Sequence, residues 1–155
     1  MYIRELRECA EFVAGDNCLL REILHPDKAD LAIRYSLAHA VVKPGDTTWN
    51  HRLRTSEVYY IMEGEGVMHI NGESAPVHPG STVYIPPMAD QCITNSGKTD
   101  LKFICIVDPA WRAEDEVVAG RQNRSNGNPH QKNRLKKSFY DFASLIAYRH
   151  FSGKD

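Results

Sequence analysis

Short stretches of alternating large and small or polar residues, separated by turns, occupy most of the chain. The clearest stretch is Leu31–Val42, which we predict to be a half-buried β-strand because every second residue falls on the same face. The residues of its larger face are Ile33, Tyr35, Leu37, His39 and Val41. We expect this face to point inward, which would make His39 either a hydrogen-bonded core histidine or part of a binding site.

Several more short segments are rich in β-branched and aromatic residues and are bounded by glycine, proline or asparagine. The predicted strands are Cys18–Leu24, Glu57–Met62, Val67–Ile70, Thr82–Ile85, Gln91–Thr94 and Leu101–Val107. The pair Asn71-Gly72 suits a tight hairpin, because both residue types tolerate positive φ. Short strands without long intervening helices predict an all-β fold, an antiparallel sandwich or barrel.

The two ends of the chain follow a different pattern. Apolar residues at helical spacing predict a short helix in Met1–Ala14, the start of a helix in Glu114–Ala119 and an amphipathic terminal helix in Phe139–Phe151. We therefore expect an N-terminal helix and strand extension over residues 1–30, a barrel core over 31–112, and a C-terminal extension over 113–155 containing a basic flexible linker.

Composition and charge do not identify a function, but they limit the classes of binding partner that we expect. The net charge of −1 gives no general attraction to nucleic acid or membranes, although residues 121–155 hold eight of the 19 Lys and Arg residues. The charged N-terminus and the lack of a long apolar run lead us to expect a cytoplasmic protein without a membrane segment. Four cysteines without a CxxC pair are expected to be reduced and mostly buried.

Two segments, 44–64 and 72–95, carry glycines, prolines and potential ligands in an ordered series. The first contains Gly45, His51, Leu53, Glu57 and Gly64, and the second contains Gly72, Gly80, Gln91 and Asn95. They resemble the paired motifs of the cupin superfamily, and the resemblance covers about Leu31–Val107. It implies a small jelly-roll barrel of two antiparallel sheets, with short helical extensions at its ends.

The resemblance also implies a metal site, with two changes. His51 and Glu57 match the first and last ligand positions of the first motif, whereas Leu53 replaces its second histidine and Gln91 replaces the histidine of the second motif. We predict that His51, Glu57 and Gln91 hold a divalent transition metal such as Mn, Fe, Ni or Zn. A buried hydrogen-bond cluster without metal would explain the same residues. If His39 points inward, it could replace one of the lost ligands.

Function therefore remains open between two classes. In the first, a cupin metalloenzyme acts on a sugar, sugar phosphate or carboxylate, and either Tyr59, as the catalytic residue, or a metal-bound water handles the protons. The resemblance implies isomerase, oxygenase or lyase chemistry. In the second, the barrel is a non-catalytic module that binds such a metabolite. The predicted substrate-binding residues are His39, Trp49 and Tyr84, since they could line a pocket. The resemblance and the apolar segment Phe103–Val107 further predict a homodimer.

Overall fold

The structure is a computed structural model that describes residues 1–119, all within one compact unit. These residues form eleven strands and two short 3-10 helices. The strands are β1 (Glu11–Val13), β2 (Leu19–Leu24), β3 (Ser36–Val42), β4 (His51–Leu53), β5 (Ser56–Glu63), β6 (Gly66–Ile70), β7 (Glu73–Val77), β8 (Thr82–Ile85), β9 (Gln91–Asn95), β10 (Leu101–Asp108) and β11 (Glu116–Val118). The 3-10 helices are η1 (Leu6–Glu8) and η2 (Ala113–Asp115).

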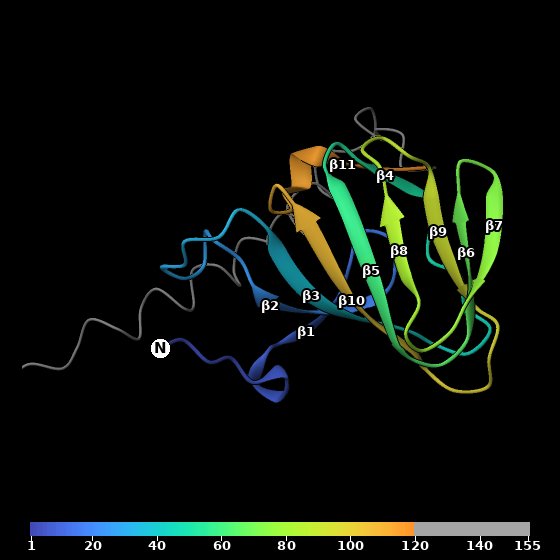
Figure 1. Ribbon diagram of the computed structural model, residues 1–155, viewed down its shortest axis with the longest axis horizontal. Coiled ribbons are helices and arrows are strands. Elements are labelled where there is room, and N and C mark those ends of the chain that lie inside the picture. Colours follow the sequence, from blue (N-terminus) through green and yellow to red (C-terminus); the bar gives the residue numbers. More distant parts are fainter. Residues whose placement is uncertain (120–155) are drawn as a thin grey trace, which may run out of the picture. The chain divides into compact units, whose positions relative to one another are not determined.

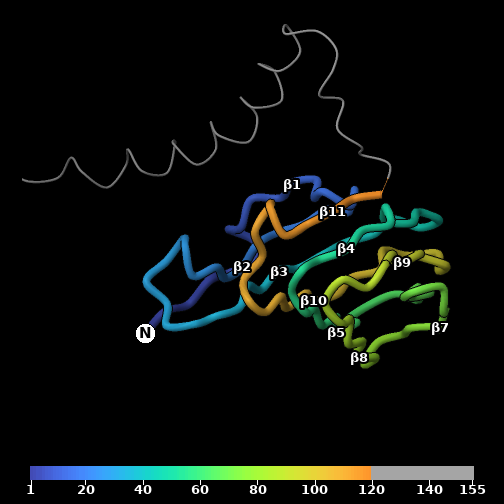
Figure 2. The backbone as a smooth tube through the Cα atoms, turned by 90° about the horizontal axis from the view of Figure 1, so that it is seen from above, coloured from blue at the N-terminus to red at the C-terminus, as the bar shows by residue number. Residues whose placement is uncertain are grey.

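The strands form two antiparallel sheets that enclose a common core (Figures 1 and 2). The six-stranded sheet has the order β1-β2-β3-β10-β5-β8, and the five-stranded sheet has the order β11-β4-β9-β6-β7. This arrangement confirms the predicted all-β double-sheet barrel. No helix in residues 1–119 has the length and apolar character that crossing a membrane requires.

The inner face of β3 carries the small residues of the strand. Ala40 lies opposite Phe103 of β10, which lies opposite Ile61 of β5, and all three side chains are almost fully buried. Because Phe103 and Ile61 fill the core at this level, only a small side chain fits beside them on β3. The prediction that the larger face of Leu31–Val42 points inward was therefore wrong, and β3 begins only at Ser36.

Both predicted helices at the ends of the described region were also wrong. Met1–Ala14 forms only the single turn η1 before β1, and β1 pairs with β2 from Glu11 opposite Arg21. Glu114–Ala119 becomes the end of η2 followed by β11, which pairs with β4. In each case strand pairing satisfies the backbone, and this outweighs weak helical spacing. The linker and Phe139–Phe151 lie outside the described residues.

The turns show why particular glycines are needed. Asn71 and Gly72, with φ of 50° and 85°, form the predicted hairpin turn between β6 and β7. Gly64 has φ of 83°, and a Cβ there would lie 2.6 Å from the carbonyl oxygen of Asp100, so a side chain would collide with the backbone. Pro76 lies in β7 at the edge of its sheet, where its missing N–H breaks no ladder.

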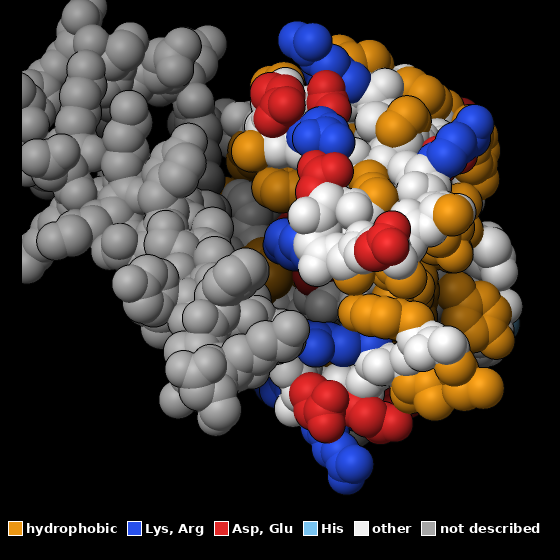
Figure 3. Space-filling view, turned by 90° about the vertical axis from the view of Figure 1, so that its left-hand side faces the viewer, with side chains coloured by type: hydrophobic (Ala, Val, Ile, Leu, Met, Phe, Trp, Pro, Cys, Tyr) orange, Lys and Arg blue, Asp and Glu red, His pale blue; other side chains and the backbone are white. Residues whose placement is uncertain are grey.

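The surface is a mixture of charged and apolar groups. On the side drawn in Figure 3, acidic and basic side chains alternate with hydrophobic ones. Seven ion pairs have both partners within residues 1–119, and all of these are at least partly exposed. Exposed pairs of this kind contribute little stability individually, so the packed core between the sheets dominates the stability of the fold.

Candidate functional site

The three predicted ligand residues meet inside the barrel and come from both sheets. His51 of β4 and Gln91 of β9 are direct partners in the five-stranded sheet, so their side chains share its inner face. Gln91 Nε2 donates a 2.9 Å hydrogen bond to Glu57 Oε2, across the core to β5 of the other sheet. The exposed fractions of His51, Glu57 and Gln91 are only 5%, 5% and 1%. We call these three residues the interior cluster.

The tautomer of His51 is set by the main chain. Its Nδ1 lies 3.0 Å from the carbonyl oxygen of Trp49, and because a carbonyl can only accept, Nδ1 must carry the proton. The lone pair of the neutral ring is therefore at Nε2, to which no described residue donates a hydrogen bond. A histidine that ligates a metal is usually held in this way, with its second nitrogen donating to a carbonyl.

The side-chain oxygen of Gln91 is a hydrogen-bond acceptor to which no described residue donates. Its amide nitrogen is used by Glu57, whereas Oε1 is buried and has no hydrogen-bond partner among the described residues. Leaving a buried acceptor unpaired costs about 1 to 3 kcal/mol. Such an atom is a reason to expect a further group, a donor or a cation, beside Gln91.

The carboxyl group of Glu57 is strongly perturbed. Burial raises its pKa to about 7; His51 and the hydrogen bond from Gln91 oppose this effect, and the charges of Asp16 and Glu116 add to it. Near neutral pH the group is divided between its charged and protonated forms. A nearby cation would favour the carboxylate form, and a nearby acceptor would favour the protonated form.

The resemblance to cupins implies a metal ion at this place in the barrel. No group of three or more His, Cys, Asp and Glu side chains suited to a metal ion occurs in residues 1–119. A site here depends on the Gln91 amide oxygen as its third donor. Nε2 of His51, the carboxylate of Glu57 and the unpaired Oε1 of Gln91 fit a cation that keeps several positions for water or ligand.

Tyr59 lies beside the interior cluster, as the alternation of β5 predicts. It is 4% exposed and packs on Phe103 with the ring centroids 4.6 Å apart. Burial, followed by the charge of Glu57, raises the pKa of Tyr59 well above its usual value, so the phenol stays protonated. It can donate a proton or hydrogen bond, which limits the catalytic role predicted for it to that of a donor.

Two acidic residues near Glu57 were missed by the sequence analysis. Asp16 is 7% exposed and its Oδ1 accepts the backbone N–H of Cys18 at 3.2 Å. Glu116 lies in β11, directly opposite Leu53. The sequence analysis placed Asp16 in a turn and Glu116 in a helix. Both are dozens of residues away from β5 in the sequence, so nothing in their local pattern indicated that they lie near Glu57.

Two cysteines also lie near the interior cluster. Burial is the main cause of the raised pKa values of Cys18 and Cys105, and the charges of Asp16 and Glu57 add to it for both thiols. The thiols therefore stay protonated and behave as apolar core residues. All four cysteines of the chain are free and three are buried, which confirms that part of the sequence prediction.

The predicted substrate-binding residues lie apart from the interior cluster or at its edge. His39 is buried, but it lies on the outer face of the six-stranded sheet, opposite Arg21 and Ile104. Tyr84 is also on an outer face and is 63% exposed, because its neighbour Ile85 occupies the core. The expectation that His39 points inward was wrong, since the small residues of β3 occupy that face. Trp49 touches the site through its main chain, which binds His51.

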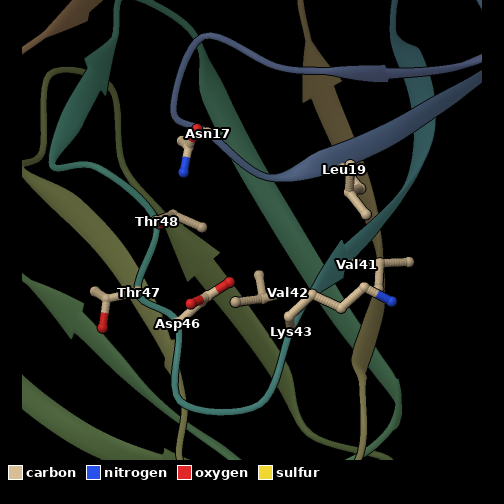
Figure 4. Close-up of a pocket in the computed structure, with 8 residues that line it drawn as sticks. All are labelled: Asn17, Leu19, Val41, Val42, Lys43, Asp46, Thr47 and Thr48. Carbon is tan, nitrogen blue, oxygen red and sulfur yellow. The ribbon is translucent and has the colours of Figure 1, made fainter.

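A separate small pocket of about 40 Å³ lies at the C-terminal end of β3 (Figure 4). Its lining residues are Asn17, Leu19, Val41, Val42, Lys43, Asp46, Thr47 and Thr48. None of the predicted site residues lines it. Its size is enough for about one or two water molecules.

A two-sheet antiparallel barrel with a polar cluster buried between its sheets defines a class of small binding and catalytic β-barrels. The family model described as a cupin domain matches residues 38–107, which include all three members of the interior cluster. The chain belongs to the cupin superfamily.

Its similarity to individual proteins is moderate. It is 39% identical over 108 residues to the uncharacterized protein MJ1618 of Methanocaldococcus jannaschii, covering 69% of this chain and 86% of the relative. It is 34% identical over 90 residues to the oxalate-binding protein of Thermotoga maritima, covering 57% and 69% respectively. A solved cupin 2 conserved barrel domain protein from Salinispora arenicola CNS-205 has a TM-score of 0.62 at 21% identity, covering 74% and 91%.

Proposed function

We propose that the chain is a cupin that binds a divalent cation through His51, Glu57 and Gln91, and that this site takes a small polar metabolite. When bound, the cation would supply a Lewis acid for the oxygen atoms of that metabolite. The residues of the chain hold the cation, orient the ligand and keep the site largely closed to water. Tyr59 is the proposed proton donor.

One observation carries the proposal, namely the excess of acceptors in the interior cluster. Nε2 of His51, the carboxylate of Glu57 and Oε1 of Gln91 are acceptors, and the only donor between them is the Gln91 amide nitrogen. A cation would satisfy all three at once. The oxygen-rich set favours Mn²⁺, and the imidazole also suits Fe, Ni or Zn.

The relative named an oxalate-binding protein supports a small carboxylate as the ligand class. Such a ligand could occupy the positions that three protein donors leave open on the cation. Sugars and sugar phosphates would also offer suitable oxygen atoms. The ligand is therefore tested with oxalate first, followed by a panel of sugars and sugar phosphates.

The experiment is a titration of purified, chelator-treated protein with Mn²⁺, followed by the loss of the free-ion electron paramagnetic resonance signal. We expect one site per chain, with affinity reduced at least 30-fold in His51→Ala because its single imidazole ligand is lost. His39→Ala is the matched control, since His39 is also buried but lies on the outer face. Oxalate should raise the melting temperature of the loaded protein.

The proposal is contradicted if wild-type protein binds no Mn²⁺, Fe²⁺, Ni²⁺ or Zn²⁺. Equal losses of affinity in His51→Ala and His39→Ala would contradict the placement of the site. The absence of cation binding would favour a second candidate, a metal-free binding module. The pKa of about 7 for Glu57 supports that alternative, because the protonated acid could donate to a ligand acceptor at neutral pH.

We also propose that a second copy of this chain covers the outer face of the six-stranded sheet. A row of apolar side chains crosses five strands there, formed by Leu24, Leu37, Ile106, Val58 and Tyr84. The charged residue nearest to Ile106 on the same face of β10 is Asp108, which is paired with Arg34 at 2.6 Å. Two copies could therefore meet through the row about a two-fold axis without burying an unpaired charge.

A further inference from the structure

The carbonyl group that fixes the tautomer of His51 lies just before β4. Trp49 accepts the Nδ1–H of His51 at 3.0 Å, whereas β4 begins only at His51. The position of this carbonyl therefore depends on main-chain contacts outside the ladder of β4. If the carbonyl turned away, the ring of His51 could take either tautomer, and its Nε2 would no longer be reserved for a cation.

The main chain on both sides of this carbonyl is anchored by distant segments. The N–H of Trp49 donates to the carbonyl oxygen of Asp16 at 2.7 Å, and the carbonyl oxygen of Asn50 accepts the N–H of Ala119 at 2.8 Å. Asp16 and Ala119 both lie outside residues 38–107, which match the family model. The acceptor of His51 is thus held in place from outside the part of the chain that matches the family.

The side chain of Asp16 stabilises the turn that makes the first of these contacts. Its Oδ1 accepts the N–H of Cys18 at 3.2 Å, and Asn17 between them has φ of 73°. Aspartate commonly accepts an N–H two residues further along in such turns. The bond spans the peptide group whose carbonyl accepts the N–H of Trp49, so it fixes the direction of that carbonyl.

This arrangement is buried and continuous. Asp16 and Cys18 are 7% and 5% exposed, so removing the side chain of Asp16 would leave a buried N–H without its acceptor and favour another conformation of the turn. Asn17 and Thr48, the neighbours of Asp16 and Trp49, line the same small pocket, which shows how close the two segments lie (Figure 4). A change at Asp16 therefore has a short path to His51.

We propose that Asp16 is a positioning residue for the interior cluster: its side chain holds the turn that fixes Trp49, and Trp49 in turn fixes the tautomer and orientation of His51. The consequence for cation binding rests on the proposed function, whereas the consequence for the imidazole ring does not. Asp16 is not proposed as a ligand, because residues 1–119 contain no group of three His, Cys, Asp or Glu side chains suited to a metal.

The first arm of the test measures Mn²⁺ affinity in variants that separate the hydrogen bond from the charge. Asp16→Ala removes both and should weaken binding about tenfold, as loss of an outer support for a ligand does. Asp16→Asn keeps an acceptor at Oδ1 and should stay within about threefold of wild type, since it loses only a charge. Asp46→Ala, which removes an exposed carboxylate from the loop that carries Trp49, should change affinity less than about twofold.

The second arm observes the ring of His51 directly, by two-dimensional nitrogen–proton NMR of the histidine side chains in metal-free buffer at pH 8. The His51 signals are identified by their absence in His51→Ala. Wild type, Asp16→Asn and Asp46→Ala should show the tautomer with the proton on Nδ1, as the bond to Trp49 requires. Asp16→Ala should show a mixture of the two tautomers.

An unchanged His51 tautomer in folded Asp16→Ala would overturn the inference whatever its affinity for Mn²⁺, since a merely structural role would lower only the melting temperature. Equal changes in Asp16→Asn and Asp16→Ala would also overturn it, because they would show that the charge acts and not the hydrogen bond. If Asp16→Ala does not fold, Asp16→Ser takes its place, with a weaker acceptor and a smaller shift of tautomer in the same direction. If wild type binds no cation, the proposed function fails and the tautomer still decides the role of Asp16.

Discussion

The inner and outer faces of the six-stranded sheet use the same residue types for different purposes. Tyr59 and Tyr60 are neighbours in β5, yet Tyr59 is 4% exposed and Tyr60 is 48% exposed. A similar contrast holds for the two buried histidines: His51 of the five-stranded sheet faces the interior, whereas His39 lies on the outer face of the six-stranded sheet. Alternation along a strand thus decides whether a side chain takes part in chemistry or in surface contacts, and a slip of one residue would exchange the two sets.

The largest expected difference between the faces is in packing. Phe103→Ala should lower the free energy of unfolding by about 3 to 5 kcal/mol, because it removes a buried ring from between the sheets. Ile104→Ala, one residue along on the outer face, should cost about 1 kcal/mol. Urea unfolding at equilibrium measures both. Similar losses for the two variants would mean that the sheet does not divide into a core face and a surface face.

The next effect concerns the buried carboxyl group on the inner face. The pKa of Glu57 is raised to about 7 from an ordinary value near 4.5, so the folded state holds its proton more tightly than the unfolded chain does. Stability is therefore lost as the pH rises from about 4.5 to 7, and at pH 8 the loss is about 3 kcal/mol. In metal-free buffer, Glu57→Gln should recover most of this lost free energy of unfolding at pH 8. At pH 4, where the wild-type group is protonated in both states, the substitution should recover almost none.

The control for that experiment is Glu73→Gln, which removes an exposed carboxylate from β7. It should change stability by less than about 0.5 kcal/mol at either pH. Chemical denaturation at the two pH values gives the comparison directly. A Glu57→Gln variant that is no more stable than wild type at pH 8 would show that this carboxyl group keeps its charge at no cost.

The smallest of these effects tests the outer face. Ile106→Arg places a charge in the centre of the apolar row and should weaken self-association at least tenfold, whereas Arg52→Ala, in the other sheet, should leave it unchanged. Light scattering across a range of protein concentrations measures the change. Wild-type protein that is monomeric at micromolar concentration would remove the basis for a second copy on this face.

The parts that sequence predicted well are those that depend on local patterns. Alternation identified β5, β6, β8, β9 and β10 with small errors at their ends, and it placed Glu57 and Tyr59 on the same inner face. Turn chemistry identified the Asn71-Gly72 hairpin. The positions of His51, Glu57 and Gln91 in the motifs anticipated that they would meet.

The parts that sequence missed depend on pairing between distant segments. β1 and β11 are three-residue strands that exist because β2 and β4 offer partners, and their own spacing looked helical. The inner face of β3 was assigned by size, which failed because Phe103 of a distant strand leaves room only for alanine. Asp16 and Glu116 approach the site through the same long-range contacts, so no local signal reported them.

The most direct test of the interior cation site is the affinity of Gln91→His for Ni²⁺, measured by isothermal titration calorimetry. Imidazole is a better ligand for Ni²⁺ than a neutral amide oxygen, and Gln91 lies opposite His51 on the inner face. If His51, Glu57 and Gln91 share one cation, the substitution should tighten binding at least tenfold over wild type with one ion per chain. Unchanged or weaker binding in a folded Gln91→His variant would contradict the account.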